Sequence, residues 1–281
     1  MKWFLIEIKY NIWAFLEKNS MKILITGGNG YVGSSLYDNL SNEFDVTKIC
    51  RSDFDLRNIT SMLNFFENKY FDMIINCASI GGSRLKEDGW DVLVNNVDIF
   101  YNLMHCSEHF GKLINFGSGA SRYNFLTPYG LSKLVIEKTI STHPKFYNIN
   151  IFAVFDENES DNRFIKTSIK NYINKNPMEI FVNKKMDFVY MPDFISIVKY
   201  YILNDNPPKE IDCTYSETKT LVDITNIINE LGDYKVNVLR TGYSAPHYCE
   251  NYHGEYTPIN LNYIGIEQGI KNVYTSLIHE N

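Results

Sequence analysis

Three side chains near the middle of the sequence have types and a spacing that suit proton transfer at a carbonyl group. Tyr129 and Lys133 stand four residues apart, which places both on one face of a helix. A lysine charge lowers the pKa of a neighbouring phenol and lets it shuttle a proton. Ser118 directly follows a strand-like run and can hydrogen-bond a substrate carbonyl. We therefore predict Ser118, Tyr129 and Lys133 as catalytic residues. The alternative is a surface tyrosine and lysine beside a turn serine.

A glycine-rich stretch closer to the N-terminus suits phosphate binding. Gly27, Gly30 and Gly33 stand three residues apart, directly after an apolar run and before a stretch of helical spacing. A backbone without Cβ atoms can turn tightly and approach a pyrophosphate, which then lies at the helix N-terminus. We predict that this loop, with Tyr31 and Val32, binds a dinucleotide. Otherwise it is a tight turn that packs a helix on a strand.

The residues after the second predicted strand bear on the choice between NADP(H) and NAD(H). A basic residue there suits the 2′-phosphate of NADP, and an acidic residue suits the ribose 2′-hydroxyl of NAD. Arg51 and Ser52 suit the phosphate, whereas Asp53 suits the hydroxyl. We favour NADP(H), and NAD(H) is the alternative, in which case Arg51 is a solvated surface charge.

Strand-like and helical patterns alternate from Met21 to Phe155. The predicted strands span residues 22–26, 46–50, 73–76, 113–116 and 149–155, and the predicted helices span residues 31–40, 59–66, 92–110 and 132–140. This alternation is typical of an α/β fold, a Rossmann-type doubly wound parallel sheet that binds ligands at the carboxyl ends of its strands. We expect an N-terminal extension at 1–20 and a dinucleotide-binding core at 21–155. Residues 156–281 are expected to form a small C-terminal substrate lobe mixed with the last sheet elements.

The composition argues against several other classes of protein. The 281 residues carry a net charge of −6 and no long basic run, so nucleic acids and anionic membranes are not the expected partners. No apolar run approaches the roughly 20 residues that a membrane span needs. The five cysteines form no CxxC pair, which fits reduced thiols in a cytoplasmic protein.

With these motifs, the sequence resembles the extended short-chain dehydrogenases/reductases, also called the NAD-dependent epimerase/dehydratase family. The matching segments are GGNGYVG at 27–33, Asp55-Leu56, NCAS at 76–79, Asn96-Val97, PYGLSK at 128–133, DFVYMPD at 187–193 and GIEQGIKNVY at 265–274. Met186 stands where the family has an arginine before the DFxYVxD segment. The resemblance extends from about Met21 to about Leu277.

The resemblance implies a nucleotide-sugar substrate and a homodimer. It implies reduction of a 4-keto sugar nucleotide, with a nucleotide-sugar 4-epimerase or 4-dehydrogenase as the alternative. A non-enzymatic dinucleotide sensor is an alternative of another class, but a sensor would gain nothing from the three catalytic residues. The implied cofactor-binding residues are Gly27, Gly30, Tyr31, Val32, Gly33, Arg51, Ser52, Asp55, Leu56, Cys77, Ala78, Ser79, Asn96, Tyr129 and Lys133, and the implied substrate-binding residues are Gly82, Ser83, Ser118 and Lys185.

Gly81 and Gly82 are similar to a glycine pair of the GDP-fucose synthase branch, which epimerises and then reduces its substrate. That branch uses a cysteine two residues after the serine and a downstream histidine, but this chain has Ala120 there and no histidine between His143 and His247. The resemblance therefore implies reduction without epimerisation.

We expect no metal, although His105 with His109 and the stretch 247–253 contain residue types that bind metals.

Overall fold

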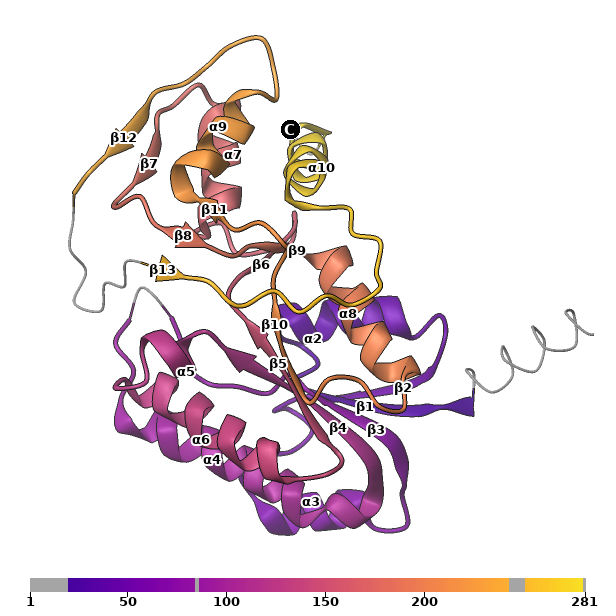
Figure 1. Ribbon diagram of the computed structural model, residues 1–281. Helices are drawn as coiled ribbons and strands as arrows, with labels where there is room; N and C mark the ends of the chain where they lie inside the picture. The colour runs from indigo at the N-terminus through magenta and orange to yellow at the C-terminus, as the bar shows by residue number, and fades with distance from the viewer. Residues whose placement is uncertain (1–19, 84–85, 243–250, 280–281) are drawn as a thin grey trace, which may run out of the picture. The chain divides into compact units, whose positions relative to one another are not determined.

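The computed structural model describes residues 20–83, 86–242 and 251–279, drawn in colour in Figure 1. The described residues form two compact units, one within 20–116 and 127–148 and the other within 117–126 and 149–279. Most of the expected N-terminal extension, together with His247 and Cys249, lies outside the described residues. In the described part of the chain, no helix is long and apolar enough to cross a membrane.

The first unit contains parallel strands with helices between them. Its elements are β1 (Lys22–Thr26), α2 (Tyr31–Leu40), β2 (Asp45–Ile49), α3 (Ile59–Phe66), β3 (Phe71–Asn76), α4 (Trp90–His105), most of β4 (Phe110–Ser118), α6 (Pro128–Thr142) and the start of β5 (Phe146–Ile151). Strand β1 pairs in parallel with β2 and β3, and β3 pairs in parallel with β4. Helix α2 lies on one face of these strands, and α3, α4 and α6 lie on the other (Figure 1). The predicted doubly wound Rossmann-type sheet is therefore confirmed.

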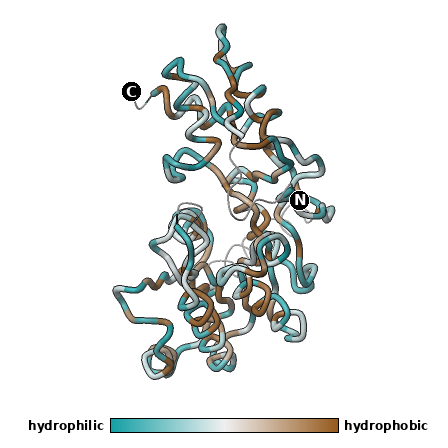
Figure 2. The backbone as a smooth tube through the Cα atoms, turned by 90° about the vertical axis from the view of Figure 1, so that its left-hand side faces the viewer, coloured by the Kyte–Doolittle hydropathy of each residue, from teal (hydrophilic) through white to brown (hydrophobic). Residues whose placement is uncertain are grey.

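Burial of the sheet on both faces explains why its strands are continuous apolar runs. Ile23, Leu24 and Ile25 of β1 are fully buried, although neighbouring side chains of a strand point to opposite faces. Along the chain, hydrophobic stretches of residues alternate with hydrophilic ones (Figure 2). The strand order of the six-stranded sheet is β10-β5-β4-β3-β1-β2, where β10 is Glu210–Cys213. The chain reverses direction across the sheet next to β1, and ligands bind at such a switch point in this kind of fold.

Several predicted boundaries were wrong, among them the start of the helix expected at 132–140, which begins at Pro128. The helix expected at 92–110 ends at His105, because the Cys106 N–H turns back to the carbonyls of the last turn and Phe110 already pairs with Phe71 as the first residue of β4. The strand expected at 149–155 is two strands, β5 and β6 (Val154–Phe155). Strand β6 pairs with β9 (Val189–Tyr190) in a separate small sheet, so the chain changes sheets within the predicted strand.

A ladder of hydrogen-bonded side chains runs across four neighbouring strands of the first unit. Thr26 Oγ1 donates to Asn76 Oδ1 at 2.7 Å, Asn76 Nδ2 donates to Asn115 Oδ1 at 2.9 Å, and Asn115 Nδ2 donates to Asn148 Oδ1 at 2.9 Å. All four side chains are buried. A buried polar group must find a partner, and each of these finds it on the next strand. The ladder therefore helps to fix the register of the strands just before the loops that follow β1 and β3.

The second unit has its own hydrophobic core and several short strands. Besides β6, β9 and β10, its elements are α5 (Ala120–Tyr123), α7 (Phe164–Ile173), β7 (Met178–Ile180), β8 (Lys185–Met186), α8 (Met191–Leu203), β11 (Lys219–Thr220), α9 (Leu221–Asn229), β12 (Val238–Arg240), β13 (Asn251–Tyr252) and α10 (Ile266–His279). The core includes Ile169, Tyr172, Ile224 and Ile270, which are all fully buried. Residues from α7, α9 and α10 thus pack against one another.

A buried carboxylate at the end of the segment 187–193 holds the chain that precedes α10. Asp193, at the start of α8, accepts hydrogen bonds from the backbone N–H groups of Ile264 and Gly265 and from the Tyr215 hydroxyl. Gly265 has φ +85°, a conformation that residues with a Cβ rarely adopt. Asp193 thereby anchors the chain that leads into α10.

Candidate active site

The glycine loop after β1 has the close backbone packing that a dinucleotide cradle requires. Gly27 has φ +65°, and a Cβ there would lie 2.8 Å from the backbone of Cys77 and Ala78. A Cβ on Gly33 would lie 2.4 Å from the Gly27 carbonyl oxygen. Gly30, the N-cap residue of α2, offers no side-chain cap, and the start of a helix is a place where backbone N–H groups bind anions. The loop therefore fits the pyrophosphate of a dinucleotide at the carboxyl end of β1.

The turn after β2 uses the carboxylate of Asp53 internally. Asp53 Oδ2 accepts a hydrogen bond from the Cys50 N–H at 2.8 Å and another from the Cys50 thiol at 3.0 Å. The thiol and backbone hydrogen bonds lower the pKa of Asp53. Ser52 is exposed, with its hydroxyl 3.0 Å from the same thiol. Arg51 is exposed and forms no hydrogen bond or ion pair with the described residues. Of the two candidate groups for the ribose 2′-position, the acid thus has one oxygen engaged within the turn, and the guanidinium is exposed.

The predicted adenine-side segment is tied to α4. Asp55 pairs with Arg57, and the hydrogen bonds from that guanidinium and from the Arg57 N–H lower the pKa of Asp55 to about 2. Arg57 also donates to Asn95 of α4 at 3.0 Å. Asn102 of the same helix donates to the Leu56 carbonyl at 2.9 Å. These contacts hold the Asp55-Leu56 dipeptide in one place beside the helix.

Tyr129 and Lys133 lie on the first turns of α6, as the spacing predicts. Thr127 caps the helix by accepting a hydrogen bond from the Gly130 N–H at 3.1 Å, and Pro128 occupies its first turn. Lys133 is 7% exposed, and its ammonium donates to the Phe116 carbonyl at 2.9 Å. The ammonium nitrogen lies 5.4 Å from the centroid of the Tyr129 ring. Burial lowers the pKa of Lys133 to about 8.

The segment after β3 packs closely on the tyrosine. A Cβ on Gly82, which has φ +75°, would lie 2.8 Å from the Tyr129 ring. Asn96 of α4 holds this segment, because its amide bonds both the N–H and the carbonyl of Ile80, at 2.8 and 2.9 Å. The same amide donates to the Ser132 hydroxyl of α6 at 3.1 Å. Asn96 therefore joins the segment 80–82 to α6, and its amide is hydrogen-bonded to protein groups.

Cys77 and Ala78 lie where the glycine loop meets β3. The Ala78 N–H donates to Thr26 Oγ1 at 3.4 Å, which links this segment to the ladder of the sheet. Burial raises the pKa of the Cys77 thiol, so it remains protonated beside Lys133. Ser79 and Ser83 are exposed.

Ser118 is the last residue of β4 and belongs to the second unit. Its side chain is buried, and its Oγ accepts a hydrogen bond from the Ala120 N–H at 3.2 Å. The Tyr252 hydroxyl of β13 lies 3.3 Å from the same oxygen. Ala120 is buried as well, and its methyl group has no proton to transfer. The sequence identified the serine but not the tyrosine that accompanies it.

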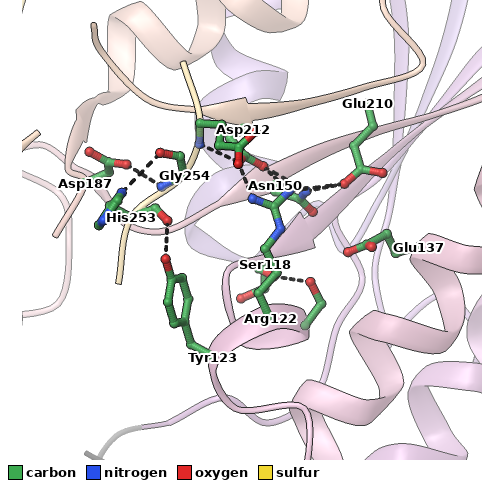
Figure 3. A network of polar contacts seen from close by, with 12 residues as sticks. Ser118, Arg122, Tyr123, Glu137, Asn150, Asp187, Glu210, Asp212, His253 and Gly254 are labelled. Atoms are coloured by element: carbon green, nitrogen blue, oxygen red, sulfur yellow. Dashed lines mark hydrogen bonds and ion pairs between the residues drawn. The ribbon is translucent and has the colours of Figure 1, made fainter. Parts of the chain in front are cut away.

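A polar network centred on the buried carboxylate of Asp212 fixes the chain around Ser118 (Figure 3). Asp212 of β10 accepts hydrogen bonds from Arg122 of α5, from Asn150 at 3.1 Å and from the Glu255 N–H at 2.7 Å. The Gly254 N–H donates to Asp187 at 2.7 Å. The two acids of Glu210-Ile-Asp212 are visible in the sequence, but no local pattern indicated which side chains would form hydrogen bonds with them. The network thus ties α5, β10 and the segment after β13 together.

Lys185, the predicted substrate-binding lysine, is exposed on β8. The neighbouring Lys184 has its ammonium 5.8 Å from the centroid of the Tyr252 ring. Within residues 20–83, 86–242 and 251–279, no three His, Cys, Asp or Glu side chains lie together as a metal site.

Comparisons with known proteins found one family model and several similar proteins. The model of the "NAD dependent epimerase/dehydratase family" matches residues 23–213, more than half of the chain. A CDP-abequose synthase of Yersinia pseudotuberculosis is 23% identical, over 78% of this chain and 87% of that protein. Among solved structures, the UDP-N-acetylglucosamine 4-epimerase of Methanobrevibacter ruminantium M1 is similar with a TM-score of 0.75 and 17% identity, covering 94% of this chain and 100% of that one. A GDP-6-OMe-4-keto-L-xylo-heptose reductase of C. jejuni is similar with a TM-score of 0.74 and 15% identity, covering 94% and 99%.

Proposed function

Because the chain belongs to the NAD dependent epimerase/dehydratase family, we propose that it is an NADPH-dependent oxidoreductase that reduces a 4-keto sugar nucleotide. The observation that carries this proposal is the buried ammonium of Lys133, which is anchored on the Phe116 carbonyl beside the ring of Tyr129. Burying a charge costs free energy, and a lysine placed in this way has a use in stabilising a phenolate. A dinucleotide sensor without chemistry would have no use for it.

Each catalytic side chain has a distinct part in the proposed reaction. The bound nicotinamide supplies the hydride that reduces the keto carbon. Tyr129 donates its proton to the carbonyl oxygen and becomes a phenolate. Lys133 holds its positive charge next to that phenolate and favours its formation. Ser118 donates a hydrogen bond to the carbonyl oxygen and orients it.

The proposal of reduction without epimerisation at C3 or C5, the carbons beside the keto group, rests on Ala120. An epimerisation at a carbon beside the keto group needs a titratable group to remove and return a proton. Ala120 stands two residues after Ser118 and has none. The likeness to a 4-keto-heptose reductase supports reduction, while the likeness to a 4-epimerase keeps a 4-epimerase as the second candidate. The two differ in that a reductase consumes NADPH and a 4-epimerase returns its hydride to the sugar.

The preference for NADPH rests on the turn after β2. Arg51 is exposed and available for a 2′-phosphate, whereas the Asp53 carboxylate is occupied by the N–H and the thiol of Cys50. A guanidinium binds a phosphate with charge-assisted hydrogen bonds, which are stronger than neutral ones.

The test is turnover of several 4-keto sugar nucleotides with NADPH by the wild type and by Tyr129→Phe. We expect the wild type to oxidise NADPH and Tyr129→Phe to lower kcat about 10²-fold or more, with the Kd for NADPH changed little. Tyr101→Phe is the matched control. Tyr101 lies on α4, and its hydroxyl is 3.1 Å from Thr139 of α6, so the control removes a phenol hydroxyl from the same pair of helices.

The control variant should keep wild-type turnover. Full activity of Tyr129→Phe would refute the tyrosine as proton donor. Interconversion of two hexose nucleotides without net NADPH consumption would favour the 4-epimerase. An absence of turnover on all keto sugar nucleotides and hexose nucleotides would favour the dinucleotide sensor.

A further inference from the structure

The hydrogen-bonding capacity of Ser118 is almost fully used by protein groups. A serine hydroxyl has one proton to donate and two lone pairs to accept with. The Ala120 N–H takes one lone pair at 3.2 Å, and the Tyr252 hydroxyl lies 3.3 Å from the same oxygen. A phenol is more acidic than an aliphatic alcohol and is therefore the better donor of the two. If Tyr252 donates, both lone pairs are occupied, and the serine proton is the one group left for a ligand.

The ring of Tyr252 is held in place by close aromatic packing. It meets the buried Phe152 edge to face, with ring centroids 5.5 Å apart, and Tyr123 at the same centroid distance. Gly119, which follows Ser118, permits this approach, because a Cβ there would lie 2.5 Å from the Phe152 ring and 3.0 Å from Tyr252 Cζ. Two side chains on one rigid cluster thus have their hydroxyl groups at hydrogen-bond distance.

The backbone that carries Tyr252 is held as well. Immediately after it, the Gly254 N–H donates to Asp187 and the Glu255 N–H donates to Asp212, each at 2.7 Å. A Cβ on Gly254 would lie 2.4 Å from the Asp212 side chain, so this glycine is needed for the contact. Tyr123 donates to the His253 carbonyl at 2.8 Å (Figure 3). The two carboxylate contacts at Gly254 and Glu255 therefore hold the backbone that directly follows Tyr252.

We propose that Tyr252 is a positioning residue that donates its phenol proton to Ser118 and thereby makes this serine a hydrogen-bond donor toward the substrate's keto oxygen. This inference rests on the proposed keto-sugar reduction. A hydroxyl that accepts two hydrogen bonds is polarised and donates a stronger one. It also has no lone pair left for a substrate hydroxyl, so the arrangement favours a carbonyl oxygen over an alcohol at this position.

A double-mutant cycle between Tyr252 and Ser118 tests the proposal. Tyr252→Phe keeps the ring and removes the donor, and it should lower kcat for keto-sugar reduction about 3- to 10-fold, as expected for one neutral hydrogen bond, with the Kd for NADPH unchanged. When Ser118→Ala is already present, the same substitution should change kcat less than about 2-fold, because its target is gone. Tyr123→Phe is the matched control. It removes a phenol hydroxyl of the same aromatic cluster that contacts the His253 carbonyl and not Ser118, so it should keep wild-type kcat.

The outcomes separate this inference from the proposed function. Keto-sugar reduction by the wild type, with a loss in Ser118→Ala, supports the function by itself. An undiminished effect of Tyr252→Phe in the Ser118→Ala protein would mean that Tyr252 acts on the substrate or the fold directly, which overturns the inference alone. An equal loss in Tyr123→Phe would likewise reduce Tyr252 to a structural role.

A measurement without substrate completes the test. In Ser118→Cys, a proton donated by Tyr252 stabilises the thiolate and lowers the pKa of the new thiol. Adding Tyr252→Phe should raise that pKa by about half a unit or more, whereas adding Tyr123→Phe should not. The pH dependence of alkylation by iodoacetamide, followed by mass spectrometry of the peptide that contains position 118, gives both pKa values. Equal values with and without the Tyr252 hydroxyl would overturn the donor role, whatever the substrate is.

Discussion

The pKa of Lys133 predicts how the rate of reduction depends on pH. During reduction Tyr129 gives up its proton, and the ammonium of Lys133 stabilises the phenolate that remains. Burial lowers the pKa of this ammonium to about 8, so the lysine loses its charge as the pH rises through that value. Its protonated fraction falls from roughly nine tenths at pH 7 to roughly one tenth at pH 9. We therefore expect kcat/KM for keto-sugar reduction to fall about tenfold between these two values.

Initial rates of NADPH oxidation at fixed ionic strength, from pH 6 to about 10, measure this profile. The Kd for NADPH is measured at each pH, because weaker cofactor binding would also lower kcat/KM. Lys133→Met identifies the titrating group. It should be slower at every pH and should lack the break near pH 8, since its side chain cannot lose a proton. A rate that stays constant up to pH 9.5 would refute the reasoning, as would the same break in Lys133→Met.

Three further predictions follow from groups outside this pair. Arg51→Ala should weaken NADPH binding by about 1.5–3 kcal/mol and leave NADH binding nearly unchanged in isothermal titration; equal affinity of the wild type for both cofactors would contradict the assignment. Because Ala120 cannot transfer a proton, incubation with a 4-keto sugar nucleotide in deuterated water should leave C3 and C5 unlabelled by NMR, and enzyme-dependent deuterium there would show another residue at work. Burial raises the pKa of Glu159 from 4.5 to about 8, so the folded state holds this proton more tightly and the free energy of unfolding should fall as the pH rises between those values. Urea unfolding should find Glu159→Gln about 1–3 kcal/mol more stable than the wild type at pH 8.5 and less dependent on pH, and parallel profiles for the two proteins would exclude this role.

The parts of the site that the sequence predicted are those with a local signal. Tyr129 and Lys133 are four residues apart on one helix, and Gly27, Gly30 and Gly33 are separated by one fixed spacing. In each case the spacing alone brings the groups to one face or one turn. The alternation of strands and helices is local in the same sense, so the doubly wound sheet could be predicted from it.

The parts that the sequence did not predict depend on contacts between distant segments. Ser118 and Tyr252 are 134 positions apart, and Arg122 meets Asp212 across 90 positions. No periodicity joins such segments, and a tyrosine at position 252 looks like any other in a chain with 20 of them. The wrong end of α4 has a related cause, because the pairing of Phe110 with Phe71 overrides a helical pattern that continues beyond His105.

The side-chain ladder across the sheet limits how this sequence can change. Replacing Asn115 alone by leucine would leave Asn76 without an acceptor and Asn148 without its donor, at about 1–3 kcal/mol for each orphaned group. Replacing neighbouring members together by apolar residues of similar shape can be nearly neutral, because no orphan then remains. A single replacement is thus the costly step, and its cost is a large share of the roughly 5–15 kcal/mol by which a typical domain is stable. Mutation one residue at a time would meet a barrier at these four positions, so variants of this protein should exchange them jointly or keep them.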